Sequence, residues 1–405
     1  MSNIYAIDCL TKQWADKLQL TAEHNIKNSA YNIHLILSNH EDWRDQIRYD
    51  EFEQRTKLNG VNWQDHNTSE CKTWFSGRYE IEPSMQNLDA SIELVAREHS
   101  YHPVREYLQS LKWDGKERLT TFLIDIFGAD KSPENLLYNS EVGRMWMISA
   151  VARVMIPGCQ ADSALILISE EQGLGKSTAC KILGKGWSAD STIDIGSKDS
   201  MQNINGVWIY ELAELSSVRS ARDIETVKQF ISSRFDRYRS SYGRRAADHP
   251  RQVVFIGSTN NAHCLHDTQN RRFWPVDVAT IDLDRLSKEV DQLWAEASVR
   301  YQNGEIWYPR DKKIKELIRT HGTAHTEIDP WQSPIAEHLA KEPLTNPKLL
   351  QPITSEYLLT GVIKIPVKDQ TRAHQMRIGL VMKSLGYTSK QVMEDNNRER
   401  RWVKN

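Results

Sequence analysis

Three short apolar runs divide the middle of the chain, and each of them ends in polar residues. The first, Ala164–Ile168, leads into a glycine-containing turn, the second, Val207–Tyr210, ends at Glu211, and the third, Val253–Gly257, ends before Ser258. Short apolar runs bounded by turn signals are typical of buried strands. Because helical patterns separate them up to about residue 302, they predict an α/β core of three layers with a mostly parallel sheet.

The segments before this core carry weaker patterns. Residues 1–100 are mixed, with many charges and short apolar alternations, and they predict a mixed α/β or collar region of unknown role. Residues 101–160 predict a helical lead-in to the core, with Pro103 at a helix start and a buried helix over Val142–Met155. The core itself is expected over residues 161–310.

Residues 330–405 predict a small separate module. Three helical patterns are followed by a short alternating end, an order typical of a winged-helix-like domain. The helices are expected over Pro334–Lys341, Ser355–Thr360 and Gln370–Leu385, and the hairpin near Gly386–Val403.

Composition narrows the class of protein. With 39% hydrophobic and 26% charged residues in a chain of 405, it is typical of a globular protein in water. No apolar stretch approaches the length of a membrane span, and the N-terminus lacks a signal-peptide pattern. The cysteines are scattered without metal-ligand spacing, which favours a reducing compartment and argues against structural zinc. These features predict a cytoplasmic protein.

Charge is unevenly distributed although the net charge is only −2. Residues 219–251 contain nine Lys or Arg against four Asp or Glu, and residues 364–404 contain ten against four. Such basic segments suggest contacts with a polyanion such as nucleic acid. The alternative is that both are solvated charged faces.

The glycine turn after the first apolar run has the pattern of a phosphate-binding loop. In Ser169–Thr178, glycines allow backbone N–H groups to surround a phosphate, and the following helix adds its positive end. Lys176 would reach the β- and γ-phosphates, and Ser177 would bind Mg²⁺. Glu170 replaces the first glycine of the usual pattern, and the alternative is a tight turn with an incidental lysine. The predicted ATP-binding residues are Gln172, Gly173, Leu174, Gly175, Lys176, Ser177 and Thr178.

Polar residues at the ends of the second and third runs extend this chemistry. Glu211 suits a Mg²⁺ ligand, and Glu214 suits the group that polarises the attacking water, although which of the two acts as base is open. Asn260 suits an amide that holds this water, because it both donates and accepts hydrogen bonds. The alternatives are solvent-facing carboxylates and an ordinary turn residue.

Two arginine-containing segments complete the candidate site. Arg271 and Arg272 precede a further predicted strand, where an arginine can either neutralise charge on a neighbouring subunit's γ-phosphate or form an ordinary salt bridge. Between the second and third runs, arginines alternate with tyrosines in a pattern that suits a DNA-gripping hairpin or an interface loop. The predicted DNA-binding residues are Arg237, Tyr238, Arg239, Arg244 and Arg245.

The order of these motifs resembles the virulence-associated E family of phage and mobile-element proteins, which are superfamily 3 helicase-like P-loop ATPases of the AAA+ type. The similarity covers roughly residues 100–310. It rests on His102–Val104, Tyr107–Leu108, Leu111–Leu119, Arg153 with Pro157–Gly158, Gln172–Thr178, Glu211–Leu215, Tyr242–Arg244, Ser258–Asn261 and Asn270–Val276.

The resemblance implies a role for each matched residue. Lys176 and Ser177 would bind phosphate and Mg²⁺, and Glu211 would complete the metal site. Asn260 would be the sensor, and Arg272 the finger that acts on a neighbouring subunit, with Arg271 second. Arg237–Arg245 would be the hairpin inserted into the DNA channel of a homo-hexamer or another ring.

The sequence therefore predicts an ATP hydrolase, with ATP and Mg²⁺ as cofactors, that acts as a helicase or translocase on single-stranded or forked DNA. The first 100 residues show no primase signature, so a separate primase or polymerase is an expected partner, and no membrane is involved. One alternative is a non-catalytic ATP-binding factor that recognises an origin, for which Glu170 is the hint. Another is an ATPase of anti-phage defence.

Overall fold

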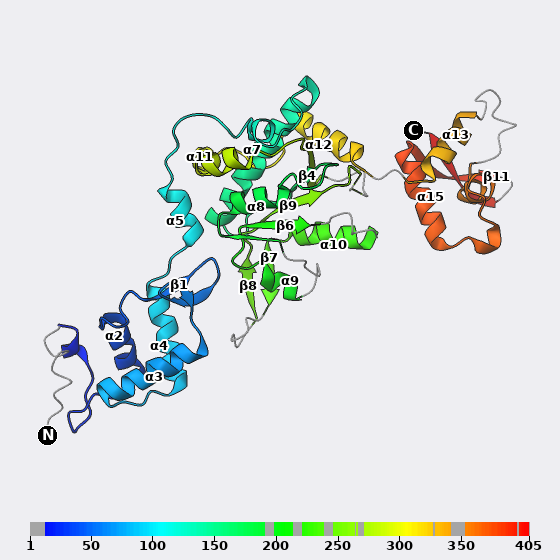
Figure 1. Ribbon diagram of the computed structural model, residues 1–405. Coiled ribbons are helices and arrows are strands. Elements are labelled where there is room, and N and C mark those ends of the chain that lie inside the picture. The colour runs from blue at the N-terminus through cyan, green and yellow to red at the C-terminus, as the bar shows by residue number, and fades with distance from the viewer. Residues whose placement is uncertain are drawn as a thin grey trace. The chain divides into compact units, whose positions relative to one another are not determined.

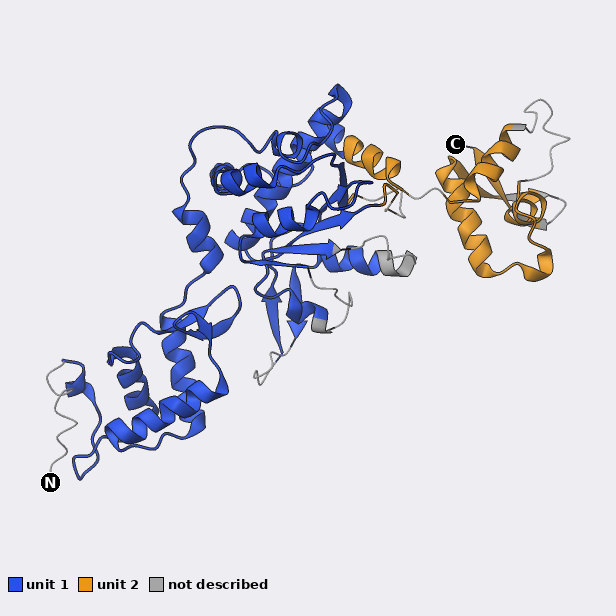
Figure 2. Ribbon diagram, in the orientation of Figure 1, with its two compact units in different colours: residues 1–260, 272–315 blue, residues 261–271, 316–405 orange. Residues whose placement is uncertain are grey.

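The computed structural model describes residues 13–190, 198–213, 221–238, 246–263, 265, 271–326, 329–341, 353–394 and 397–404. The chain divides into two compact units, one of residues 1–260 and 272–315 and the other of residues 261–271 and 316–405 (Figure 2). Among the described residues, no helix is long and apolar enough to cross a membrane.

The first unit begins with helices packed on a small antiparallel sheet. Strands β1, β2 and β3 pair in that order. Isoleucines and leucines on the inner faces of α2 and α4, together with Phe75 of α3, form a separate core. The elements are α2 (Ala30–Asn39), β1 (Ile47–Asp50), β2 (Arg55–Leu58), β3 (Val61–Asn62), α3 (Asp65–Tyr79) and α4 (Met85–Glu98), preceded by a short 3₁₀ turn over Ala15–Lys17.

A helical segment then leads to the central sheet. Helix α5 (Pro103–Ser110) starts with proline at its first turn, and the His102 side chain accepts a hydrogen bond from the N–H of Arg105. A short α6 (Phe122–Asp125) precedes the long α7 (Pro133–Met155). Helix α7 is buried on most of its surface because it lies between the sheet and α11.

The central sheet has five parallel strands in the order β10-β4-β9-β6-β5 (Figure 1). The predicted parallel sheet is therefore confirmed. Strand β9 lies between β4 and β6 and is parallel to both, so the carboxyl ends of these three strands lie side by side. The strands are β4 (Ala164–Ile168), β5 (Ser188–Ala189), β6 (Ile209–Ala213), β9 (Val254–Thr259) and β10 (Phe273–Asp277).

Helices cover both faces of this sheet. Helix α8 (Lys176–Gly184) packs on β5, β6 and β9 and touches α11 (Leu283–Gln302), which also touches α7. On the other face, Phe230 of α10 (Ala221–Ser232) lies 5.6 Å, ring to ring, from Phe255. Helix α9 (Lys198–Asn203) precedes β6. A two-stranded hairpin, β7 (Phe235–Tyr238) and β8 (Ala247–Pro250), leads into β9.

The second unit has its own apolar core. Helical segments are followed by an antiparallel hairpin, and the core includes Leu358, Ile378 and Trp402. Its elements are α12 (Lys312–Ala324), which begins in the first unit, α13 (Gln332–Lys341), α14 (Ser355–Tyr357), a π-helical turn over Leu358–Val362, a 3₁₀ turn over Val367–Asp369, α15 (Arg372–Ser384), β11 (Tyr387–Glu394) and β12 (Asn397–Lys404).

Candidate functional site

The turn between β4 and α8 has the backbone geometry that glycine permits and leads directly into a helix N-terminus. Gly173 and Gly175 have φ angles of 80° and 84°, in the left-handed region that favours glycine. Gly175 precedes the first residue of α8, and a Cβ there would lie 2.9 Å from the Leu283 side chain. The N–H groups of the first helical turn have no acceptor within the helix, so they are available to an anion.

Lys176 links this turn to the end of β9. It is the first residue of α8 and is 9% exposed. Its Nζ donates a hydrogen bond to Asn260 Oδ1 at 2.5 Å. Burial lowers the pKa of Lys176, and the nearby Glu211 carboxylate opposes that shift. The amine is therefore withdrawn from water and held beside the glycine turn.

Glu211 is the most enclosed carboxylate among the site residues that the structure describes. It is 2% exposed, and its Oε1 accepts hydrogen bonds from Ser177 Oγ at 2.7 Å and Ser258 Oγ at 2.5 Å. Its Oε2 is buried and has no hydrogen-bond partner among the residues that the structure describes. A buried carboxylate oxygen without a partner is costly. A bound cation would remove that cost.

Ser258 is a member of this cluster that the sequence reasoning did not single out. It pairs with Ala213 in the sheet, two residues beyond the Glu211–Ile256 pair, so Ser258 and Glu211 point to the same face. A strand-alternation argument finds it only when β9 is known to lie beside β6. The neighbouring Asn260 was found because it ends an apolar run.

The remaining loop residues are accessible to a ligand. Glu170, Gln172, Ser177 and Thr178 are exposed, and Leu174 is partly buried. Because Glu170 is in water, its charge is strongly screened there, so its presence does not exclude a phosphate in the turn.

Arg272 lies at the amino ends of the strands, opposite the carboxyl ends where Lys176, Glu211 and Asn260 gather. Its carbonyl accepts a hydrogen bond from the N–H of Ala164, the first residue of β4, whereas Lys176 follows the last residue. The five residues of β4 span about 13 Å at ~3.3 Å a residue. Arg272 therefore begins on the far side of the sheet from Lys176 of the same chain. Arg271 is exposed and belongs to the second unit.

Two predicted DNA-binding residues lie in the hairpin stem, on opposite faces of β7. The Arg237 side chain is 78% exposed, and its Nε lies 3.7 Å from Asp248 Oδ1. Tyr238 is 6% exposed, and its ring stacks on that of His249 at 4.0 Å. Burial raises the pKa of Tyr238. Its ring therefore packs within the stem. Glu214, Arg239, Arg244 and Arg245 lie outside the described residues.

These observations define a mixed α/β protein whose parallel sheet brings a lysine, an asparagine, a carboxylate and two serine hydroxyls together at one edge. The model of the virulence-associated protein E-like domain matches residues 108–327, more than half of the chain. The chain belongs to this family. The family resemblance inferred from the sequence motifs is confirmed.

Solved structures that match the chain include three of the NrS-1 C-terminal region. Its apo structure is 11% identical with a TM-score of 0.49, and the match covers 89% of this chain and 96% of that one. One A-form apo structure is 11% identical with a TM-score of 0.48, and the match covers 94% of this chain and 100% of that one. Another A-form apo structure is 13% identical with a TM-score of 0.43, and the match covers 74% of this chain and 78% of that one. No curated protein matches the chain.

Proposed function

We propose that this protein is an ATP hydrolase that drives a helicase or translocase along DNA, in the replication of a phage, prophage or satellite element. The observation that carries the proposal is the cluster of Lys176, Ser177, Glu211 and Asn260. They follow three strand ends in the order expected for a P-loop ATPase of the AAA+, superfamily 3 type. Their side chains form two hydrogen-bonded pairs, Lys176 with Asn260 and Ser177 with Glu211.

The residues of the cluster fit Mg²⁺ and ATP. The glycine turn and the start of α8 offer N–H groups to phosphate oxygens, and Lys176 offers a cation. Ser177 and Glu211 supply oxygen atoms, the ligands that Mg²⁺ prefers. The buried Glu211 Oε2, which lacks a partner among the described residues, is the atom that a cation would satisfy. The metal would neutralise charge on the phosphates during transfer.

Each protein group has a separate task in this scheme. Lys176 would bind the β- and γ-phosphates, which frees Asn260 Oδ1 to accept a hydrogen bond from a water molecule. Ser258 would keep Glu211 oriented while Ser177 turns to the metal. Glu214, which follows β6 directly in the sequence, is the proposed group that polarises the attacking water, with Glu211 as the alternative.

The position of Arg272 favours a ring. An arginine at the far edge of the sheet can complete a nucleotide site only in a neighbouring copy, which is the arrangement of an arginine finger supplied in trans. We therefore propose a homo-oligomeric ring with nucleotide between subunits, Arg272 as the finger and Arg271 as its neighbour.

The β7–β8 hairpin is the proposed DNA grip. Arg237 in the stem and Arg239, Arg244 and Arg245 beyond it would contact the DNA backbone, while Tyr238 would stiffen the stem. Strand β9 runs from the hairpin base to Ser258 and Asn260, a distance of about 20 Å for six residues. One strand therefore joins the grip to the nucleotide cluster. The second unit is proposed to be a winged-helix-like module.

The test is ATP turnover by the purified chain with Mg²⁺, with and without single-stranded DNA. The proposal expects turnover that DNA stimulates and that Lys176→Ala abolishes. DNA binding without turnover in the wild-type chain would instead support the non-catalytic assembly factor, and equal turnover in Lys176→Ala would refute the assignment of the site.

A further inference from the structure

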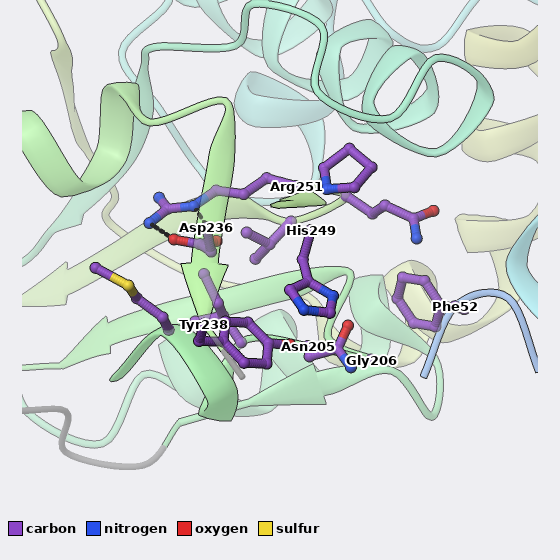
Figure 3. Close-up of a pocket in the computed structure, with 12 residues that line it drawn as sticks. Phe52, Asn205, Gly206, Asp236, Tyr238, His249 and Arg251 are labelled. Carbon is purple, nitrogen blue, oxygen red and sulfur yellow. Dashed lines mark hydrogen bonds and ion pairs between the residues drawn. The ribbon is translucent and has the colours of Figure 1, made fainter. Parts of the chain in front are cut away.

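A small cavity lies at the base of the β7–β8 hairpin, where three distant parts of the chain meet (Figure 3). The space open to the centres of water molecules is about 20 Å³. This is enough for one or two waters and too small for a nucleobase. The cavity is therefore a seam between packed segments. The residues that line it include Phe52, Asn205, Gly206, Tyr238, His249 and Gln252.

The first of these segments is the turn Asp50–Gln54, which follows β1. Asp50 is 2% exposed, and its Oδ1 accepts hydrogen bonds from the N–H groups of Phe52 at 2.9 Å and Glu53 at 3.0 Å. This side-chain-to-backbone bonding fixes the turn and directs Phe52 inward. Phe52 is 1% exposed, and its ring lies 5.3 Å from that of His102.

Polar groups of the same turn bind the residues around the hairpin. Asn205 Nδ2 donates to the Glu53 carbonyl at 2.7 Å, and Gln54 Oε1 is hydrogen-bonded to His249 Nδ1. A Cβ on Gly206 would lie 2.7 Å from the Glu53 side chain, so the two segments are in close contact. The turn thus touches both the approach to β6 and the second strand of the hairpin.

The two strands of the hairpin stem are joined by side-chain contacts where the turn meets them. His249 stacks on Tyr238 across the two strands, and Arg251 Nε and Nη2 bond Asp236 Oδ2 and Oδ1 at 2.6 Å and 2.7 Å. Both side chains of this ion pair are buried. His249 is therefore in contact with both strands of the hairpin, and Arg251 ties the stem together three residues before β9 begins.

A two-stranded hairpin is only marginally stable by itself, so its direction is set by what packs at its base. We infer that the turn Asp50–Gln54 is a positioning element for the proposed DNA-gripping hairpin, with Phe52 and Gln54 as the positioning residues. The inference rests on the proposed function only for the role of the hairpin. It assigns the N-terminal region a part in coupling DNA binding to ATP turnover.

The test compares Gln54→Ala with Gln46→Ala. Gln46 is the matched control because it is also half-buried and its Oε1 accepts a hydrogen bond from Asn59 at 2.9 Å, within the N-terminal region. Loss of one hydrogen bond at the stem is expected to speed hydrogen exchange of the β7 and β8 amides by about 3- to 10-fold in Gln54→Ala, without DNA or nucleotide. The control is expected to leave that exchange unchanged.

The second readout is the concentration of single-stranded DNA that half-maximally stimulates ATP turnover. It is expected to rise about 3- to 10-fold in Gln54→Ala, by the same lost hydrogen bond, while turnover without DNA stays at the wild-type value. Phe52→Leu, which keeps an apolar side chain in the seam, is expected to shift both readouts in the same direction.

Unchanged stem exchange in both Gln54→Ala and Phe52→Leu would overturn the inference, whatever their ATPase activity. Faster exchange with an unchanged DNA response would also overturn it, because the contact would then be packing alone. A wild-type chain without ATP turnover would refute the proposed function instead. In that case the affinity for labelled single-stranded DNA replaces the second readout, with the same expected shift.

Discussion

Replacing Ser258 by alanine tests the metal assignment at the residue that only the structure reveals. Its hydroxyl donates to Glu211 Oε1 at 2.5 Å, inside a site where the carboxylate is 2% exposed. In the proposed metal-bound state Ser177 would turn to the metal, and Ser258 would be the remaining hydroxyl that the structure shows on this carboxylate. Ser258→Ala therefore leaves Glu211 free to rotate within the site.

The size of the effect follows from the kind of bond. A hydrogen bond to a charged group contributes about 1.5–3 kcal/mol, so the free energy of unfolding is expected to fall by about that amount. Groups that orient a metal ligand typically change metal affinity by about 10- to 100-fold. We expect the Mg²⁺ concentration for half-maximal ATP turnover to rise by about that factor.

The assay is ATP turnover over a Mg²⁺ titration, combined with urea unfolding of the same variants. Ser149→Ala is the control, because Ser149 is buried and donates a hydrogen bond at 2.7 Å to a carbonyl of its own helix rather than to Glu211. It is expected to cost about 1 kcal/mol and to leave the Mg²⁺ dependence unchanged. Ser258→Thr, which keeps the hydroxyl, is expected to show the wild-type Mg²⁺ dependence. A Ser258→Ala protein with wild-type Mg²⁺ dependence would refute the reasoning.

Three further outcomes are expected. Lys176→Met should weaken ATP binding about 10- to 100-fold, because a charge-assisted contact is lost, and should change the free energy of unfolding by less than about 1 kcal/mol. Lys181→Met on the same helix should alter neither quantity. Equal ATP affinity of the two variants would contradict the proposed site. Mixing inactive Arg272→Ala and Lys176→Met subunits should restore turnover if the finger acts in trans. In a mixed ring, some interfaces combine the intact Lys176 of one subunit with the intact Arg272 of its neighbour. A mixture with no turnover would contradict the ring. Burial and Asp50 raise the pKa of Tyr101 to about 12, above its usual value near 10. The folded chain therefore holds this proton more tightly, its stability should fall as pH rises from about 10 to 12, and Tyr101→Phe should lessen that fall in urea titrations; an unchanged pH dependence would contradict the shift.

Local patterns were sufficient for the strands that carry the site. The run Ala164–Ile168 matches β4 residue for residue, and the predicted second and third strands differ from β6 and β9 by a few residues at their ends. Buried parallel strands are continuous apolar runs, so their chemistry-bearing end residues stand out. Glu211 and Asn260 were found for that reason, and Lys176 was found from the glycine turn that follows the first run.

The residues that sequence reasoning missed or placed differently depend on contacts between distant segments. Ser258 has a role only because β9 lies between β4 and β6. Tyr238 looked like a base-stacking residue, but its partner His249 lies across the hairpin and buries it. The contact of Gln54 with His249 joins residues 195 positions apart, which no local pattern indicates.

The sequence by itself determined the strands, the glycine turn, the order of the polar residues that follow each strand, and the family, because these depend on local periodicity and on short motifs. Only the tertiary structure decided that one buried oxygen of Glu211 has no partner among the described residues, that Ser258 donates a hydrogen bond to the other, and that Arg272 lies at the opposite ends of the strands from Lys176. Strand order and burial set those relations, and both arise from packing between segments far apart in the chain.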